Sequence, residues 1–135
     1  MSVFTEREIT YLNEQRLGRL ATVGANTQPH VVPVGFRYDA DDDAIHIGGR
    51  NLSETKKFRD VEHDPHVAFV VDDLASIDPW RPRGIEIRGR ARTFGEGGER
   101  FGPGFGAAWI RITPKRIISW GVSGDSDGTA TGRTV

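Results

Sequence analysis

Gly48–Arg59, with the sequence GGRNLSETKKFR, directly follows the alternating apolar run AIHI at residues 44–47. Two glycines and an arginine come first, then residues that cap helices well, then two adjacent lysines. The stretch predicts a strand that ends in a turn and leads into a helix. At such a corner, free backbone N–H groups and cations can converge on an anion. The alternative is a junction whose basic residues only face solvent, and the pattern by itself favours that alternative.

Composition sets bounds on the rest of the chain. Its 135 residues suit one domain with a modest core. It has no cysteine, which excludes disulfides, thiolate metal sites and cysteine nucleophiles. A formal net charge of -1 argues against general attraction to nucleic acid or acidic membranes. No apolar run reaches the roughly 20 residues of a membrane helix, and no signal peptide is recognisable, so the expected location is the cytoplasm.

Two helices are predicted. The first covers Thr5 to Arg16, because Thr5 and Glu8 have the spacing of a capping box. The second could start from Asn51 or Ser53 and ends before Pro65.

Apolar runs between turn residues predict about six or seven short strands. They cover Leu17–Val23, His30–Tyr38, Ala44–Gly48, Val67–Asp72, Gly84–Phe94, Ala107–Ile112 and Ile117–Val122. Their spacing favours a closed antiparallel barrel over a doubly wound sheet. A domain this small with several strands has strand edges to protect, which makes a dimer plausible. The domain thus spans residues 1–122, and residues 123–135 predict a disordered tail because they offer almost nothing to bury.

Two segments leave alternatives open, and a third predicts a loop. Pro33 and Gly35 interrupt the apolar run His30–Tyr38, which indicates either an edge strand with a bulge or backbone amides left free for a flat ligand. Trp80 lies in a proline-stiffened loop and could cover the core edge or stack on a ligand as a lid or dimer element. Gly95–Gly106 matches no nucleotide-binding spacing and predicts a flexible loop.

Familiar catalytic motifs are absent from the sequence. The four histidines form no known metal signature, and the acidic turn Asp39–Asp43 lacks the pattern of a calcium loop, so no metal site is predicted. No nucleophile elbow or carboxylate pair stands out, and no catalytic residue is assigned. If the protein catalyses a reaction, the reactive atoms belong to a cofactor.

Three blocks of sequence resemble a known family. They are QPHVVPV at residues 28–34, KKFR at 56–59 followed by Asp64-Pro65, and WRPRGIEIRGRA at 80–91. Together, over about residues 4–122, the chain resembles the pyridoxamine-phosphate-oxidase-like split β-barrel family. More narrowly, it resembles the B-type flavin/deazaflavin oxidoreductases, which use coenzyme F420. The resemblance implies a mainly β fold with two helices, a six-stranded antiparallel Greek-key split β-barrel (FMN-binding split barrel), and a homodimer with two cofactors at its interface.

The resemblance also implies where a cofactor binds. The second strand supports the ring, and its backbone amides bond the ring edge, which maps to His30, Val32, Pro33 and Val34. The corner and helix hold the phosphate, which maps to Arg50, Asn51, Lys56 and Lys57, with Arg59 as a further candidate. The facing subunit closes the site with Trp80, Arg83 and Trp120. The glycine-rich segment Gly95–Gly106 departs from the family, where many relatives carry a helix.

The implied function is an F420-dependent oxidoreductase. It transfers hydride from reduced F420 to an electron-poor double bond of a small organic substrate, and solvent can supply the proton. A basic corner suits the phosphate and the carboxylates of the F420 tail, which favours F420 over FMN. The alternatives are an FMN-dependent oxidase or reductase of the same fold and a non-catalytic module that binds a flavin or F420.

Overall fold

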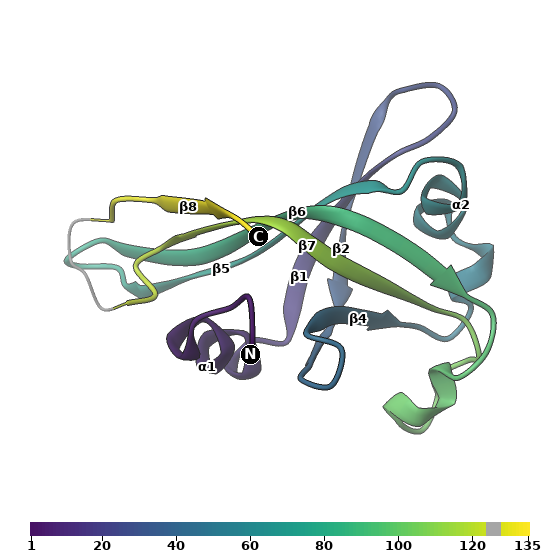
Figure 1. The fold of residues 1–135 in the computed structure, drawn as a ribbon, viewed down its shortest axis with the longest axis horizontal. Coiled ribbons are helices and arrows are strands. Elements are labelled where there is room, and N and C mark those ends of the chain that lie inside the picture. The colour runs from purple at the N-terminus through teal and green to yellow at the C-terminus, as the bar shows by residue number, and fades with distance from the viewer. Residues whose placement is uncertain (124–127) are drawn as a thin grey trace.

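Eight strands form one antiparallel sheet in the computed structural model, which describes residues 1–123 and 128–135. The strands are β1 (Leu17–Val23), β2 (Pro29–Gly35), β3 (Arg37–Asp39), β4 (Ala44–Gly48), β5 (His66–Ser76), β6 (Arg81–Phe94), β7 (Trp109–Trp120) and β8 (Thr131–Thr134). Two α-helices, α1 (Glu6–Glu14) and α2 (Lys56–His63), and two 3-10 helices, η1 (Leu52–Glu54) and η2 (Gly98–Phe101), complete the described elements (Figure 1).

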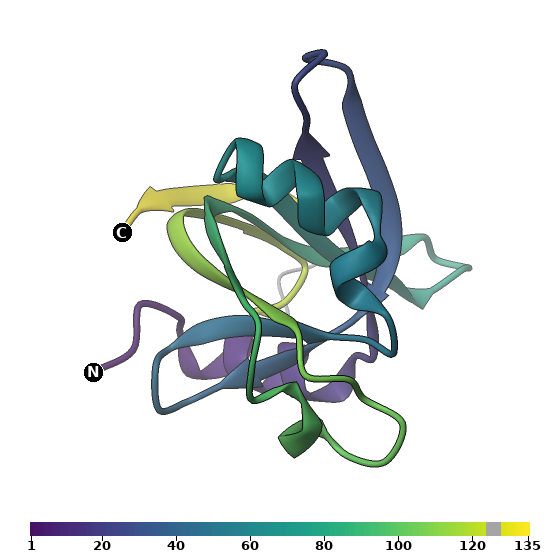
Figure 2. The same ribbon diagram turned by 90° about the vertical axis from the view of Figure 1, so that its right-hand side faces the viewer.

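The sheet is curled so that its two ends come together. Its strand order is β2-β1-β5-β6-β7-β4-β3, with β8 paired to β7. β2 and β3 are the two ends of this order, yet only Phe36 separates them in the chain. The sheet must therefore bend round until its ends meet, and Figure 2 shows the strands wrapped around the interior. This curl confirms the mainly β fold with two α-helices and is the shape of a split barrel.

The expected number of strands is wrong. The predicted strand His30–Tyr38 divides at Phe36, and its two parts belong to opposite ends of the sheet. Conversely, the two predicted strands on either side of residues 113–116 form the single strand β7. There the register shifts, because Gly89 pairs with Pro114 and the preceding Arg88 pairs with Arg116. A bulge thus accommodates a proline that the sequence pattern placed in a connection.

Helix α1 begins as its sequence predicts. The Thr5 side chain accepts a hydrogen bond from the Glu8 amide at 3.1 Å, and the Glu8 carboxylate accepts one from the Thr5 amide at 2.8 Å. This reciprocal pair confirms the capping box. The helix ends at Glu14, two residues earlier than expected.

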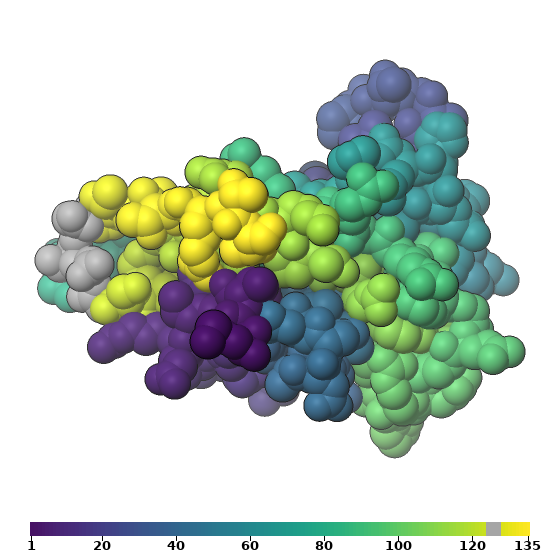
Figure 3. All heavy atoms as spheres, in the orientation of Figure 1, coloured from purple at the N-terminus to yellow at the C-terminus, as the bar shows by residue number. Residues whose placement is uncertain are grey.

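The end of the chain forms a strand, so the expected disorder is wrong for Thr131–Thr134. β8 pairs with β7, and the Arg133 guanidinium donates to the carboxylate of Glu8 and to the carbonyl of Val3. Glu8 is buried, so its pairing with Arg133 compensates a carboxylate that would otherwise lack a cation. Figure 3 shows the C-terminal segment lying against the N-terminal one. Residues 124–127 of the predicted tail lie outside the described residues.

The interior of the curled sheet is a mainly aliphatic core that also holds the buried rings of Phe4, Tyr11, Phe58 and Phe69. The largest side chains with no more than 1% exposure are Phe69, Leu12, Leu20, Ile45, Ile47, Ile85, Ile87, Ile110, Ile112 and Ile117. Helix α2 lies against β1 and β6. None of the helices in the described ranges is long and apolar enough to cross a membrane.

Candidate functional site

The corner after β4 opens the start of a helix to solvent. η1 follows β4, and α2 begins at Lys56 rather than at Asn51 or Ser53. Thr55 precedes α2, but its hydroxyl donates to the carbonyl of Leu52 at 2.6 Å and does not cap the helix. The first amides of α2 have no acceptor within the helix, and the positive end of the helix dipole adds to their attraction for an anion.

The basic side chains of the corner divide into two pairs. Lys56 Nζ donates to both carboxylate oxygens of Asp60, at 2.9 and 3.0 Å, and Arg59 donates to the carbonyl of Glu54 at 2.8 Å. Arg50 and Lys57, in contrast, have no side-chain hydrogen bond or ion pair within residues 1–123 and 128–135. Burial lowers the pKa of Lys57, as expected for an ammonium group without a neighbouring carboxylate. Arg50 and Lys57 are therefore the cations available to an anionic ligand.

Asp60 explains why Lys56 is occupied. Burial by itself raises the pKa of the Asp60 carboxyl, but hydrogen bonds from Lys56 and Thr22 outweigh it and leave the pKa below its usual value. The Thr22 hydroxyl lies 2.8 Å from Asp60, so the carboxylate ties α2 to β1. Lys56 thus has a structural partner. The spacing of four residues between Lys56 and Asp60 could have indicated this pair from the sequence.

Arg50 and Asn51 line a hollow that Lys56 does not line. A cavity of about 410 Å³ lies between η1, α2 and the end of β6, and the carboxylates of Glu54 and Glu62 also line it. The predicted phosphate residues are consequently not gathered around one point. Arg50 and Asn51 lie on the acidic hollow, and Lys56 points towards β1.

β2 is an edge strand, which fits the predicted ring support. It pairs only with β1 in the part of the chain that the structure describes. Of the predicted ring residues, Val34 is buried in the core, Val32 and His30 are partly buried, and Pro33 is exposed. β2 is thus the edge strand of one alternative, with one edge open, although its pairing with β1 contains no bulge.

The position of Pro33 determines which amides face that open edge. Pro33 pairs with Arg19 of β1, and a proline fits there when its nitrogen points away from β1. Because the backbone groups of a strand alternate in direction, the amides of Val31 and Gly35 point the same way. The amides of Val32 and Val34 then point towards β1. This alternation favours Val31 and Gly35 as donors to a ligand.

The outer face of β1 and β2 is apolar and exposed. Leu17 is 56% exposed and Val31 63% exposed. A hollow of about 600 Å³ extends from β1 and β2 over β5, β6 and β7. It is lined by apolar residues that include Ala21, Val23 and Ala68, and also by the basic residues Arg88, Arg90 and Lys115. A water-exposed apolar area of this kind is typical of an interaction surface.

The residues predicted to close the site from a facing subunit lie at the far end of the molecule. The hairpin of β5 and β6 extends to the left in Figure 1, whereas α2 lies at the right. Trp80, at the tip of this hairpin, is 66% exposed, and Trp120 packs over Gly84. In one chain, therefore, these residues do not join the corner.

Arg83 has a structural role within the chain. Its guanidinium donates to both carboxylate oxygens of Asp73, at 2.8 and 2.9 Å, and lies 5.0 Å from the ring centre of Tyr11. The hydrogen bonds from Arg83 hold the pKa of Asp73 below its usual range. Burial and the hydrogen bond to Asp73 raise the pKa of Tyr11. Arg83 thus joins α1 to the hairpin.

The glycine-rich segment is an ordered element rather than a flexible loop. It contains η2, and the amides of Gly98 and Gly106 donate to the carbonyls of Ala107 and Gly49, each at 2.8 Å. A Cβ atom at Gly48 would lie only 2.6 Å from the Phe101 ring and 2.9 Å from the Phe105 ring. Glycine at position 48 is therefore required by the close approach of these two phenyl rings.

Between this segment and α1 lies a cavity of about 360 Å³, which we name the aromatic hollow. Its lining consists of Leu12, Asn13, Gln15, Arg16, Gly35, Phe36, Arg37, Tyr38, His46, Gly48, Phe101 and Phe105. It begins at Gly35, where the open edge of β2 ends. No local pattern in the sequence predicts the aromatic hollow, because Phe101 and Phe105 reach it only through long-range packing.

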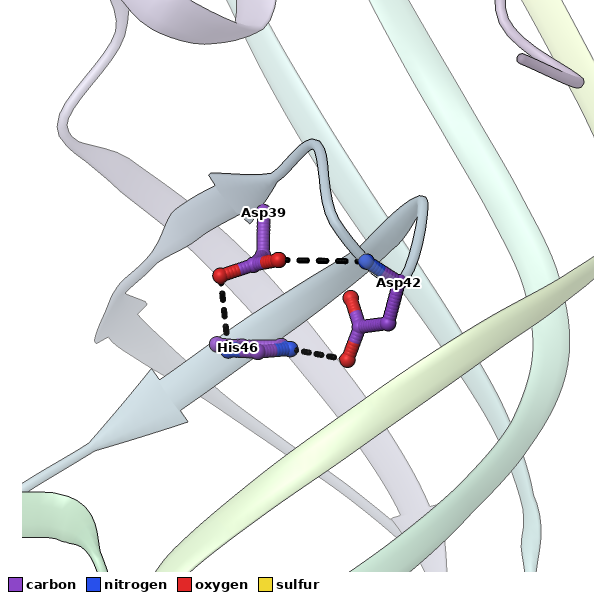
Figure 4. Close-up of side chains that lie close together, drawn as sticks. All are labelled: Asp39, Asp42 and His46. Atoms are coloured by element: carbon purple, nitrogen blue, oxygen red, sulfur yellow. Dashed lines mark hydrogen bonds and ion pairs between the residues drawn. The ribbon is translucent and has the colours of Figure 1, made fainter. Parts of the chain in front are cut away.

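His46 anchors the glycine-rich segment to β4. Its Nε2 lies 2.6 Å from a carboxylate oxygen of Asp42, and its Nδ1 lies 3.1 Å from the guanidinium of Arg100. Figure 4 shows His46 between Asp42 and Asp39, whose oxygen is 3.8 Å away. These three side chains could supply ligand atoms for a metal. However, both ring nitrogens of His46 already have partners, and one partner is a cation, which favours a structural role.

Comparison with known proteins gives a family match over most of the chain. The profile of the family described as "Pyridoxamine 5'-phosphate oxidase" matches residues 4–121. A protein of Streptomyces rimosus, named 5a,11a-dehydrotetracycline/5a,11a-dehydrooxytetracycline reductase, is 47% identical over 122 residues, which cover 90% of this chain and 86% of that protein.

Two solved structures illustrate the likeness of fold. A conserved hypothetical protein from Mycobacterium tuberculosis has a TM-score of 0.68 and 23% identity, over 88% of this chain and 86% of that one. An FAD-binding protein from Mesorhizobium loti has a TM-score of 0.64 and 19% identity, over 86% of this chain and 91% of that one. At these identities the likeness concerns the fold alone.

Proposed function

The chain belongs to the pyridoxamine 5'-phosphate oxidase family, and on this basis we propose that it is an oxidoreductase that uses reduced coenzyme F420 to reduce an electron-poor double bond. The observation that carries the proposal is the 47% identity to a named reductase over nine-tenths of the chain. That protein's name refers to a dehydrotetracycline. The proposed substrate class is therefore a planar, multi-ring compound with a carbonyl conjugated to the double bond.

The described residues fit a cofactor with a flat ring and an anionic tail. The open edge of β2 offers backbone donors to the ring, namely the amides of Val31 and Gly35, which point away from β1. The uncapped start of α2, together with Lys57, suits a phosphate, whereas Arg50 lies on the hollow lined by Glu54 and Glu62. Lys56 supports this site through its bond to Asp60 and contacts a ligand only if that bond opens.

When bound, reduced F420 supplies a hydride, and water can supply the proton that completes the reduction. The protein's own part is to bind, orient and shield. The Tyr38 hydroxyl donates to Asp43 at 2.6 Å, and burial together with this hydrogen bond raises its pKa. Tyr38 is thus a poor acid here, and the proposal assigns the proton to solvent.

We further propose a homodimer. The apolar outer face of β1 and β2 is exposed in the single chain, and burying Leu17 and Val31 against a second copy would remove that face from water. Trp80, at the tip of an extended hairpin, could then reach the site of the other copy. Trp80 would thereby complete a site that one chain leaves open.

Two alternatives share the fold. FMN would use the same ring edge and the same phosphate corner. A non-catalytic module would bind the cofactor without turnover.

Stopped-flow oxidation of bound reduced cofactor tests the proposal directly. The protein is loaded with reduced F420 or reduced FMN and mixed with enones, quinones and a dehydrotetracycline. The proposal predicts acceptor-dependent oxidation with F420. Oxidation only with FMN supports the flavin enzyme, and binding without oxidation by any acceptor supports the module.

A further inference from the structure

We infer that the aromatic hollow binds the multi-ring acceptor and that Arg16 recognises an ionised oxygen on it. This inference rests on the proposed function for the identity of the ligand, whereas the hollow itself rests on geometry alone. The volume of about 360 Å³ lies within the range of cavities that hold small organic ligands.

The hollow is separate from the phosphate corner. Arg50, Asn51, Lys56 and Lys57 do not line it. It begins instead at Gly35 and Phe36, directly beyond the open edge of β2. A ligand in the hollow would therefore lie next to a ring supported by that edge, which is the arrangement that transfer between two flat molecules requires.

The walls of the hollow suit a flat, unsaturated ligand. Phe101 is fixed, because the Arg37 guanidinium donates to its carbonyl at 3.3 Å and the Arg100 guanidinium lies 4.4 Å from its ring centre. Phe105 meets Phe101 edge to face, with ring centres 5.8 Å apart, yet remains 40% exposed. One ring is thus braced and its neighbour is open to stack on a ligand.

The charge at the mouth of the hollow selects an acidic ligand. Arg16 lines the hollow, is exposed, and has no hydrogen bond or ion pair among the described residues. Two carboxylates that bind residues of the lining also have other partners: Asp73, which accepts from Gln15, binds Arg83, and Asp43, which accepts from Tyr38, binds Ser2. A guanidinium without a partner beside an aromatic wall matches a planar molecule that carries an enolate or carboxylate oxygen.

Two naphthoquinones of nearly equal shape test this inference. The 2-hydroxy compound is anionic at neutral pH, and the 2-methyl compound is neutral. Binding of each to the resting protein is measured by calorimetry, and KM and kcat are measured with reduced cofactor. The variants are Arg16→Gln, Phe105→Ala and the control Arg92→Gln. Arg92 is an exposed arginine that stacks on Phe94 and does not line the hollow.

The inference predicts a distinct pattern. Arg16→Gln weakens binding of the anionic quinone about tenfold, as loss of one charge-assisted hydrogen bond implies, and leaves the affinity for the neutral quinone unchanged. Phe105→Ala weakens the binding of both quinones, and Arg92→Gln weakens the binding of neither. Equal affinities of all variants for both quinones overturn the inference, even if the enzyme turns over. Conversely, Arg16-dependent binding without any turnover supports the aromatic hollow as the binding site and contradicts the proposed function.

Discussion

Lys56 Nζ lies 2.9 Å from one carboxylate oxygen of Asp60 and 3.0 Å from the other, one turn further along α2. The ammonium group of Lys56 is therefore already bound by a carboxylate of the same helix. Its neighbour Lys57 has no such partner in the described part of the chain. We therefore assign the proposed anion-binding role chiefly to Lys57.

Lys57→Ala should weaken cofactor binding by about 1–3 kcal/mol, because a charge-assisted hydrogen bond to the phosphate is lost. Lys56→Ala should weaken it less and should instead lower the free energy of unfolding, since Asp60 stays buried without its cation. The double variant Lys56→Ala, Lys57→Ala should resemble Lys57→Ala in affinity. Calorimetric titration and urea unfolding measure the two effects. Unchanged cofactor affinity in the double variant would refute the assignment of the phosphate corner.

Acid should destabilise the fold through its buried carboxylates. The folded pKa of Asp60 is lowered, because hydrogen bonds from Lys56 and Thr22 outweigh burial. A lowered folded pKa stabilises the protein above the unfolded value of about 4, and that stability is lost as the pH falls through the folded pKa. Urea midpoints measured from pH 7 to pH 3 should fall on the acid side, and Asp60→Asn should reduce the fall. An identical acid dependence in Asp60→Asn contradicts this explanation.

Arg133→Gln should destabilise the protein by about 1–3 kcal/mol, since it leaves the buried carboxylate of Glu8 without its ion pair. Lys115→Gln is the control. Lys115 lies on the neighbouring β7, is exposed, and its side chain has no partner among the described residues, so its loss should cost less than about 0.5 kcal/mol. If both variants unfold at the same urea concentration, β8 contributes nothing through Arg133.

Gly48→Ala should lower the free energy of unfolding by about 1–3 kcal/mol, because the new methyl group meets the rings of Phe101 and Phe105. Gly49→Ala is the matched control, since a Cβ there makes only ordinary contacts at 3.5 Å with Leu52. Phe105→Ala should partly rescue Gly48→Ala by removing one of the two rings. Equal stability of the two alanine variants would show that the glycine-rich segment does not rest on Gly48.

Local signals in the sequence predicted the parts of the fold that local chemistry determines. The capping box of Thr5 and Glu8 placed the start of α1 correctly. Strands β1 and β4 have the predicted bounds, because each is a short run bounded by turn residues. The positions of helices and strands that depend on nearest neighbours were thus accessible without the structure.

Long-range contacts explain what the sequence did not predict. β8 has almost nothing to bury, and it is held by pairing with β7 and by the ion pair of Arg133 with Glu8, 125 residues away. The glycine-rich segment is ordered by Arg100, whose partner His46 lies 54 residues earlier. The site shows the same limit: the sequence indicated four basic residues at the corner, but only packing shows that Asp60 occupies Lys56.

Titration of the purified protein with F420 and with FMN by isothermal calorimetry tests the central claim most directly. If the protein uses F420, it binds F420 saturably and more tightly than FMN, and Lys57→Ala binds F420 more weakly. Tight binding of FMN with no binding of F420 would contradict it.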